Sequence, residues 1–178
     1  MGHVYGPNSP EYEAEAASFW LTFEYVFKNY KKDKDTLFLF TADHGQDTCS
    51  EMHYLNIEYP GIEGYLKKGG RGQVLIPYGE SRAAFIQVKE DKIEKMLGVL
   101  KDGLRGKAGV FRTDEVLRLG VFGPPPYHSS FLKRIGQVVV LPYAGQSVGW
   151  YVDENTKVKA GYHGGLTEEE ALTQLVVW

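Results

Sequence analysis

An acidic side chain and an imidazole stand side by side in the segment Thr41–Gly45, which reads Thr-Ala-Asp-His-Gly. The segment follows the apolar run Thr36–Phe40, which is typical of a buried strand. In open α/β sheets, ligands bind just beyond the carboxyl ends of strands. Carboxylate and neutral imidazole are ligands that zinc and similar divalent ions prefer. Asp43 and His44 therefore predict a metal-binding position, with an ordinary surface turn as the alternative.

Two further histidines lie among glycines near the ends of the chain. His3 stands in Gly-His-Val-Tyr-Gly-Pro, and His163 stands in Gly-Tyr-His-Gly-Gly. Glycines allow close backbone approach and give no packing of their own, so we expect His163 to face a ligand rather than a core. His53 and His128 have no partner at ligand spacing and are left out. The predicted metal ligands are His3, Asp43, His44 and His163.

Composition and charge exclude several classes of protein. The chain has 178 residues, of which 43% are hydrophobic, so we expect one α/β domain over residues 1–178. A net charge of −3 does not favour nucleic acid or anionic membranes as partners. Cys49 is the single cysteine, which excludes an intrachain disulfide and suggests a reducing, cytoplasmic location. Residues 1–10 lack the pattern of a signal peptide, and no apolar run reaches the ~20 residues of a membrane helix.

Amphipathic spacing predicts the helices that position these residues. A long helix is expected over residues 11–31, with Ser9 as its cap, followed by a solvated turn over residues 31–35. Shorter helices are expected over residues 91–101 and over residues 113–119, the latter capped by Thr113. A capping-box pattern at Thr167 predicts a final helix.

Short apolar runs predict the strands. They cover residues 36–41, 73–76, 82–88 and 137–141, and the remainder of residues 45–80 reads as irregular. Because helices alternate with buried strands, the predicted fold class is α/β.

Three patterns, in this order, resemble the carboxy-terminal portion of the type I phosphodiesterase/nucleotide pyrophosphatase family, within the alkaline phosphatase superfamily. They are Gly2–Pro7 before a long helix, Thr41–Gly45, and Gly161–Glu170. The resemblance covers residues 3–178 and implies an alkaline-phosphatase-like sheet with flanking helices. It also implies a hydrolase of phosphodiester or pyrophosphate bonds that acts on a small phosphate ester.

The resemblance further implies two divalent ions, of zinc type, bridged by a phosphate. His3 and His163 would help to hold one ion, and Asp43 and His44 would hold the other. In this family a metal-activated Thr or Ser attacks phosphorus, because a hydroxyl is a weak nucleophile until it is activated.

Parts of the family pattern have no match in this sequence. An Asp that precedes the position of His3 in this family falls before Met1, and no Thr or Ser stands in the nucleophile's context. The resemblance therefore implies a partial catalytic domain without its amino-terminal half, which binds metal weakly and is inactive alone. We expect an exposed apolar surface where the absent strands would pack, covered by self-association or by a partner chain.

Two other functions stay open at this stage. The chain could be a non-catalytic interaction protein that retains the second half of the fold, or a metal-binding α/β domain unrelated to phosphate. Arg71, Tyr78, Arg82 and Tyr143 could line a phosphate pocket, although surface or core roles are favoured for each.

Overall fold

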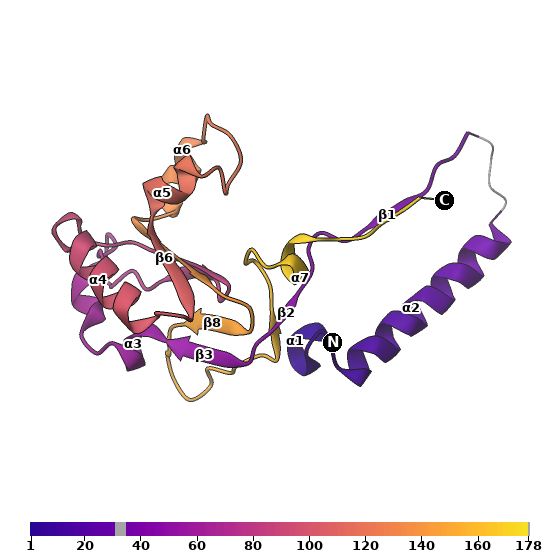
Figure 1. Cartoon of the computed structure of the whole chain (residues 1–178), viewed down its shortest axis with the longest axis horizontal. Coiled ribbons are helices and arrows are strands. Elements are labelled where there is room, and N and C mark those ends of the chain that lie inside the picture. The colour runs from indigo at the N-terminus through magenta and orange to yellow at the C-terminus, as the bar shows by residue number, and fades with distance from the viewer. Residues whose placement is uncertain (31–34, 178) are drawn as a thin grey trace. The chain divides into compact units, whose positions relative to one another are not determined.

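The computed structural model describes residues 1–30 and 35–177, which form two compact units. Unit 1 comprises Met1–Cys49 and Lys159–Trp178, and unit 2 comprises Ser50–Val158. In Figure 1 the indigo and yellow ends of the chain make up unit 1, and the magenta and orange segments make up unit 2. The single domain expected over residues 1–178 stays a prediction.

Unit 1 begins with a single helical turn, α1 (Gly2–Tyr5), and a long helix, α2 (Pro10–Asn29). Ser9 caps α2, because its side-chain oxygen accepts a hydrogen bond from the Tyr12 N–H at 3.2 Å. Proline at the first helical position suits this start, since its missing N–H would have no partner there. The predicted helix and its cap are confirmed. The predicted turn at residues 31–35 lies, for residues 31–34, outside the part of the chain that is described.

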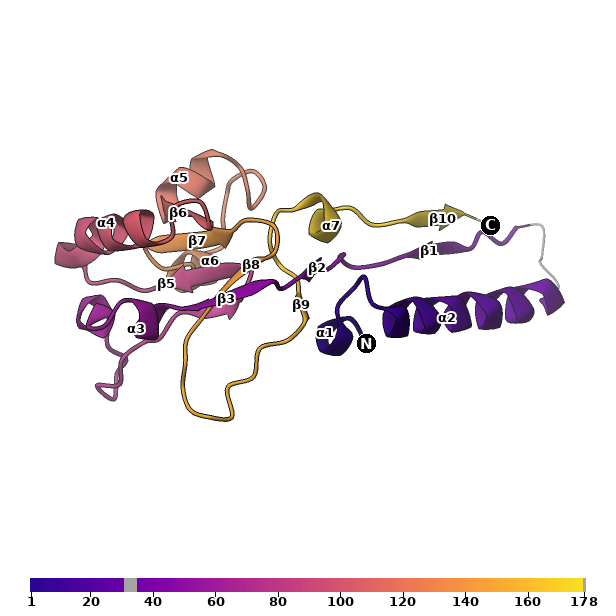
Figure 2. The same cartoon turned by 60° about the horizontal axis from the view of Figure 1, so that its bottom comes forward.

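The strand that carries the Asp-His pair is shorter and more exposed than predicted. β1 (Leu39–Thr41) pairs antiparallel with β10 (Leu175–Val177), as Figure 2 shows. Phe40 packs against α2, with its ring centroid 5.4 Å from that of Phe19. Leu39 points to the other face and is 61% exposed. The prediction of a buried strand is therefore wrong in this unit, because α2 covers only one face of the two-stranded ribbon that β1 and β10 form.

The predicted final helix is a single turn. α7 (Glu168–Ala171) has Thr167 at its N-cap position as expected, but the Thr167 side chain caps no backbone N–H and Leu172 already has extended dihedral angles. The chain then continues into β10, whose pairing with β1 replaces further helical hydrogen bonds. A second small ladder joins β2 (Asp47–Thr48) to β9 (Gly161–Tyr162), also antiparallel.

Unit 2 is built on a four-stranded antiparallel sheet with the strand order β4-β5-β7-β6. The predicted strands over residues 82–88 and 137–141 correspond to β5 and β7. The predicted strand over residues 73–76 is reduced to an isolated bridge between Lys68 and Val74. The sheet consists of β4 (Tyr78–Glu80), β5 (Ala83–Ile86), β6 (Ala108–Arg112) and β7 (Val138–Pro142).

Residues 45–80 are more regular than predicted. They contain β3 (Glu51–Tyr54), α3 (Leu55–Glu58) and a 3-10 turn at Ile62–Tyr65. β3 pairs in parallel with β8 (Gln146–Gly149), a partner distant in sequence that no local pattern identifies.

Helix α4 (Ile93–Gly103) covers the sheet and closes the core of unit 2. Its apolar stripe is fully or nearly fully buried, as the spacing predicts: Ile93, Met96, Leu97 and Leu100. These side chains pack with β-branched residues of the sheet, among them Val138 and Val140.

Two short helices complete unit 2, α5 (Thr113–Arg118) and α6 (Ser129–Arg134). The cap of α5 is Arg112 rather than the predicted Thr113, because the Glu115 carboxylate accepts a hydrogen bond from the Arg112 N–H at 3.0 Å. None of the helices in residues 1–30 and 35–177 combines the length and apolar character needed to cross a bilayer.

Candidate functional site

All four predicted metal ligands belong to unit 1. Asp43 and His44 follow β1, His163 follows β9, and His3 lies in α1. Helix α1 packs beside β9 (Figure 2), so the two histidines from opposite ends of the chain come together.

The three imidazole rings form one cluster. The ring centroid of His163 lies 5.2 Å from that of His3 and 3.9 Å from that of His44. The rings of His44 and His163 are stacked, with an angle of 22° between their planes. The fold thus brings together side chains from three segments far apart in the sequence.

Backbone carbonyl groups orient two of these rings. His3 Nδ1 lies 2.7 Å from Gly161 O, and His44 Nδ1 lies 2.7 Å from Gly45 O. A carbonyl oxygen only accepts, so each Nδ1 carries the hydrogen and each Nε2 keeps its lone pair. This arrangement is usual for histidines that bind metals through Nε2. The Gln46 side-chain amide also lies 3.0 Å from His3 Nδ1, and its oxygen can accept there if the amide is reversed.

The carboxylate of Asp43 remains open to solvent beside His44. Its Oδ1 accepts a hydrogen bond from the His44 N–H at 3.0 Å, which fixes the turn. Its Oδ2 lies 3.6 Å from His44 Nε2, and 87% of the side chain is exposed. An oxygen and a nitrogen donor therefore face the same region.

Close backbone approach explains two of the glycines in the motifs. The Gly45 N–H donates a hydrogen bond to Glu170 O at 2.9 Å, and a Cβ on Gly45 would overlap the carbonyl oxygen of Glu169. A Cβ on Gly161 would lie 2.6 Å from Gly2 O. Glycine at both positions lets the loop after β1, the carboxy-terminal loop and α1 touch through their backbones.

A buried carboxylate holds the loop that follows His163. Glu170 is 3% exposed, and its oxygens accept hydrogen bonds from the Gly165 N–H at 2.9 Å and the Thr167 hydroxyl at 2.8 Å. From the sequence, Thr167 and Glu170 are recognisable only as a capping box. The spacing was the available signal, but the burial of Glu170 depends on contacts between loops.

The cluster is not a complete metal site as it stands. Among residues 1–30 and 35–177, no group of three or more His, Cys, Asp or Glu side chains is arranged to hold a metal ion. The donor chemistry fits a divalent ion, but the donor set is incomplete, and the four ligand assignments stay predictions.

Other polar residues singled out in the sequence have structural surroundings. Arg82 is buried, and its guanidinium donates hydrogen bonds to the backbone carbonyls of Tyr143 and Gln146. Burial raises the pKa of Tyr78, an effect that Gln87 and Arg134 oppose. Buried His53 contacts Glu58, with 3.0 Å between Nδ1 and Oε1.

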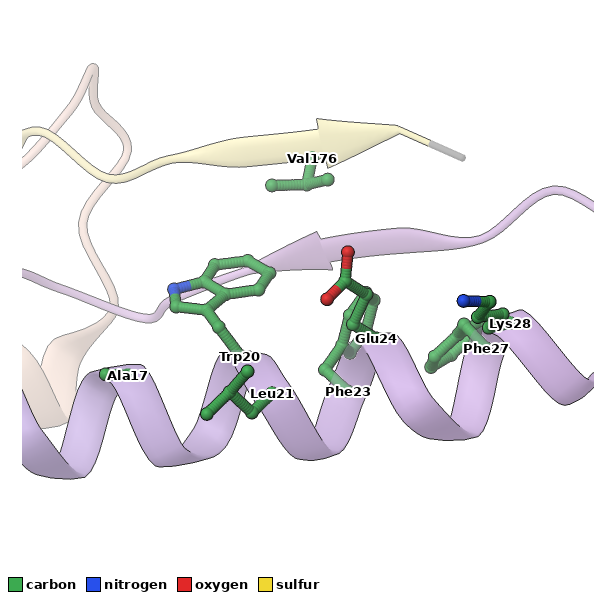
Figure 3. A pocket seen from close by; sticks show the side chains of 8 residues that line it. All are labelled: Ala17, Trp20, Leu21, Phe23, Glu24, Phe27, Lys28 and Val176. Carbon is green, nitrogen blue, oxygen red and sulfur yellow. The ribbon is translucent and has the colours of Figure 1, made fainter.

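A hollow of about 810 Å³ in unit 1 is lined by α2 and Val176 rather than by the predicted ligands. Figure 3 shows the Trp20 ring extending from α2 toward the ribbon of β1 and β10, with Val176 of β10 on the opposite side of the hollow. Its lining is largely apolar, so its chemistry differs from that of the imidazole cluster.

Several solved structures share this fold. Human ectonucleotide pyrophosphatase/phosphodiesterase 5 superposes with a TM-score of 0.64 at 18% identity, over 99% of this chain and 43% of that one. An inactive variant of the murine protein, in complex with AMP, gives 0.60 at 18% identity, with coverage of 99% and 43%. Phosphonoacetate hydrolase from Sinorhizobium meliloti, with phosphonoformate, gives 0.62 at 19% identity, with coverage of 98% and 42%.

These likenesses confirm the α/β, alkaline-phosphatase-like fold. At such identities they show the fold alone. The chain spans less than half the length of these structures, which agrees with the prediction of a partial fold.

A comparison with curated proteins gave no match. A family model described as type I phosphodiesterase / nucleotide pyrophosphatase matches residues 1–166, a segment that includes all three motifs' histidines. The resemblance inferred from the motifs is thereby confirmed. The chain belongs to the type I phosphodiesterase/nucleotide pyrophosphatase family.

Proposed function

We propose that this chain contributes part of the metal site of a hydrolase that cleaves phosphodiester or pyrophosphate bonds. The observation that carries the proposal is the convergence of three imidazoles, with ring centroids 3.9 and 5.2 Å from that of His163. The AMP and phosphonoformate complexes of similar structures support a small molecule with a phosphate or phosphonate group as the substrate.

In this proposal His3 and His163 hold one divalent ion, and Asp43 and His44 hold the other. Imidazole ligands favour zinc over magnesium or calcium. Such ions, when bound, polarise phosphoryl oxygens and activate an attacking hydroxyl. The chain's own contribution is positional: the Gly161 and Gly45 carbonyls set which ring nitrogens of His3 and His44 are available.

The remaining ligands and the Thr or Ser nucleophile are proposed to come from the part of the family fold that this chain does not span. The incomplete donor set among the described residues supports this, since it lacks a three-ligand group. Alone, the chain would then bind zinc weakly and show no turnover. A cytoplasmic location remains part of the proposal.

An exposed ribbon face supports the need for a partner. Opposite the face that α2 covers, β1 and β10 present apolar side chains to solvent: Leu39 is 61% exposed, Leu175 65% and Val177 58%. Apolar surface of this kind marks interfaces. We propose that further strands and helices of the same fold, on a partner chain or a longer form of this protein, cover it.

The alternative is a non-catalytic metal-binding or interaction protein with the second half of the fold. The observation that favours it is that the described residues include no group of three or more His, Cys, Asp or Glu side chains arranged to hold a metal ion. The two functions differ in whether any longer form of the protein turns over a phosphate ester.

Zinc binding and turnover test the proposal together. Zinc affinity of the chain, measured by competition with a chromophoric chelator, should fall roughly tenfold or more in His163→Ala and in Asp43→Ala, because each change removes a proposed ligand. His128→Ala, which changes a histidine in unit 2, is the matched control and should leave affinity unchanged. Equal affinity in all variants would remove these residues from the site.

Turnover is measured with a nucleotide phosphodiester and a phosphonate ester. A longer protein that contains this chain should hydrolyse one of them, and Asp43→Ala should abolish the reaction while leaving the fold intact. Zinc binding without turnover in any longer form would support the alternative and defeat the hydrolase proposal.

A further inference from the structure

The two edges of the four-stranded sheet in unit 2 differ in how well they are protected. At one edge, β4 has only three residues, and Gly79 has a φ of 101° that distorts the strand. At the other edge, β6 has five residues, and its first four, Ala108–Phe111, are uncharged. Edge strands are usually shortened, charged or bent, because an open edge pairs with other strands. β6 has the properties of an edge that accepts a further strand.

Hydrogen bonds that flank β6 show which of its backbone groups point outward. The Tyr143 N–H donates to Lys107 O at 2.9 Å, and the Thr113 N–H donates to Gln137 O at 3.0 Å. In an antiparallel ladder the bonded residues alternate. Over residues 107–113, the backbone N–H and C=O groups of the odd-numbered residues therefore point toward β7. Those of the even-numbered residues point toward the open edge.

One outward-facing residue keeps both of its groups available. The Ala108 N–H already donates a hydrogen bond to Leu104 O at 3.0 Å, and the Arg112 N–H already donates one to the Glu115 carboxylate at 3.0 Å. Val110 is an even-numbered position of β6, and no loop or side-chain hydrogen bond within unit 2, whose residues are all described, uses its N–H or C=O. An antiparallel strand placed against this edge can therefore exchange two hydrogen bonds with Val110.

A groove of about 560 Å³ runs along this edge, and Val110 is among its lining residues. Lys101 and Arg105, which precede β6, provide cations at one end, although Arg105 also pairs with Asp102 at 2.9 Å. Glu115 provides a carboxylate at the other end, where α5 follows β6. The groove thus changes sign along its length.

Leu119 adds an exposed apolar side chain to the acidic end of this groove. It is 72% exposed and follows Glu115 by four residues, so the two lie on the same side of α5. A partner that fits must therefore offer a strand edge, an apolar contact and opposite charges in reverse order.

We propose that the occupant is a second copy of this chain, with β6 pairing antiparallel to β6 of the copy and Val110 opposite Val110. A two-fold axis at Val110 makes its N–H and C=O self-complementary, as an isologous interface requires. The same axis brings Lys101 and Arg105 of each copy to Glu115 of the other. Opposite charges across an interface favour this register over a parallel one. The two four-stranded sheets become one continuous sheet.

The first test is the mass of the full chain in solution, measured by sedimentation over a range of concentrations. The wild type should show a monomer–dimer equilibrium that weakens with added salt. Leu119→Lys should raise the dimer dissociation constant about tenfold or more, because it places a cation opposite Lys101 and Arg105 of the copy. Leu132→Lys on α6, where the leucine is 46% exposed, is the control and should have no effect.

The second test locates the interface by hydrogen exchange. Protection of the Val110 amide should rise with protein concentration in the wild type and in Leu132→Lys, but not in Leu119→Lys. A chain that stays monomeric overturns the proposal. So does a dimer whose Val110 amide exchanges at the same rate at every concentration, which would place the contact elsewhere, for instance on the ribbon of unit 1. Protection that appears only with a different protein would also overturn it.

Discussion

Unit 2 contains a core of fully buried apolar side chains, whereas unit 1 exposes many of its apolar side chains. In unit 2, Leu100 of α4 and Val140 of β7 are both 0% exposed. In unit 1, the apolar and aromatic side chains of α2 include Leu21 at 69% and Tyr25 at 73% exposure. The two units therefore differ in how much of their stability comes from their own core.

The difference matters because the predicted metal ligands all lie in the less well-packed unit. Unit 1 is held by aromatic contacts around Phe40, by two short ladders and by backbone contacts between glycine-rich loops. Unit 2 has a closed core of its own. We infer that unit 1 gains most from a partner, whereas unit 2 folds cooperatively around its sheet.

Hydrogen exchange of the full chain should show the largest contrast. Amides of β7 should exchange about a thousandfold or more slowly than those of β10, because opening of a core strand approaches the global unfolding free energy and fraying of a two-stranded ribbon does not. Mass spectrometry of the exchanging protein measures both. Similar protection of the two strands would contradict the contrast between the units.

A pair of leucine truncations tests the same contrast energetically. Leu100→Ala in α4 should lower the free energy of unfolding by about 2–5 kcal/mol, since it leaves a cavity in a closed core. Leu21→Ala in α2 should change it by no more than about 0.5 kcal/mol, because the side chain is already exposed. Urea unfolding followed by circular dichroism measures both. A large loss for Leu21→Ala would mean that unit 1 is packed in solution.

Within unit 1, the buried carboxylate of Glu170 provides a more local test. Glu170→Gln should weaken the bonds from Gly165 and Thr167 by roughly 1–3 kcal/mol, because charge-assisted hydrogen bonds become neutral ones. Exchange of the Gly165 amide should speed up accordingly, with unit 2 unaffected. Glu168→Gln, at an exposed position of the same turn, is the control. An unchanged Gly165 amide would exclude the proposed role of Glu170.

The smallest effect is expected from an exposed carboxylate of unit 2. Burial would raise the pKa of Asp114, but hydrogen bonds from Arg118 and Arg112 outweigh it and hold the pKa below its ordinary value. Because the pKa of Asp114 is lowered in the folded state, its ionised carboxylate stabilises the fold at pH values above the unfolded pKa of about 4. This stabilisation is lost as pH falls through the folded pKa. The gap in urea midpoint between wild type and Asp114→Asn should therefore close from neutral pH to about pH 2. A gap independent of pH would rule out this coupling.

Local signals predicted helices α2 and α4. Ser9 and Pro10 marked the start of α2, and the stripe from Ile93 to Leu100 marked α4, because capping and helical periodicity depend on neighbours in sequence. The cap at Thr113 was wrong by one position. Arg112 has no capping hydroxyl, and what fixes the start is the Glu115 carboxylate reaching back to the Arg112 N–H.

Strand pairing between segments distant in the sequence could not be predicted from local patterns. The pairs β3–β8 and β1–β10 each join residues far apart in the sequence. No local pattern shows that the chain forms β10 there and does not continue as a helix. The exposure of Leu39 was missed for a related reason, since an apolar run does not show whether both faces of a strand are covered.

The candidate site shows the same division. The motifs identified the residue types and the family, because Gly-flanked His and Asp-His pairs are short-range patterns. The stacking of His44 on His163 and the hydrogen bond from Gly165 to Glu170 depend on tertiary contacts among three loops, which the motifs do not encode.

Gly45 couples distant parts of unit 1. Its N–H is bonded to Glu170 O, and no side chain fits between this backbone and that of Glu169. The segment bearing Asp43 and His44 is thus fastened directly to the turn that precedes the last strand. Docking of another element along that strand would therefore displace Asp43 and His44 through backbone contacts alone.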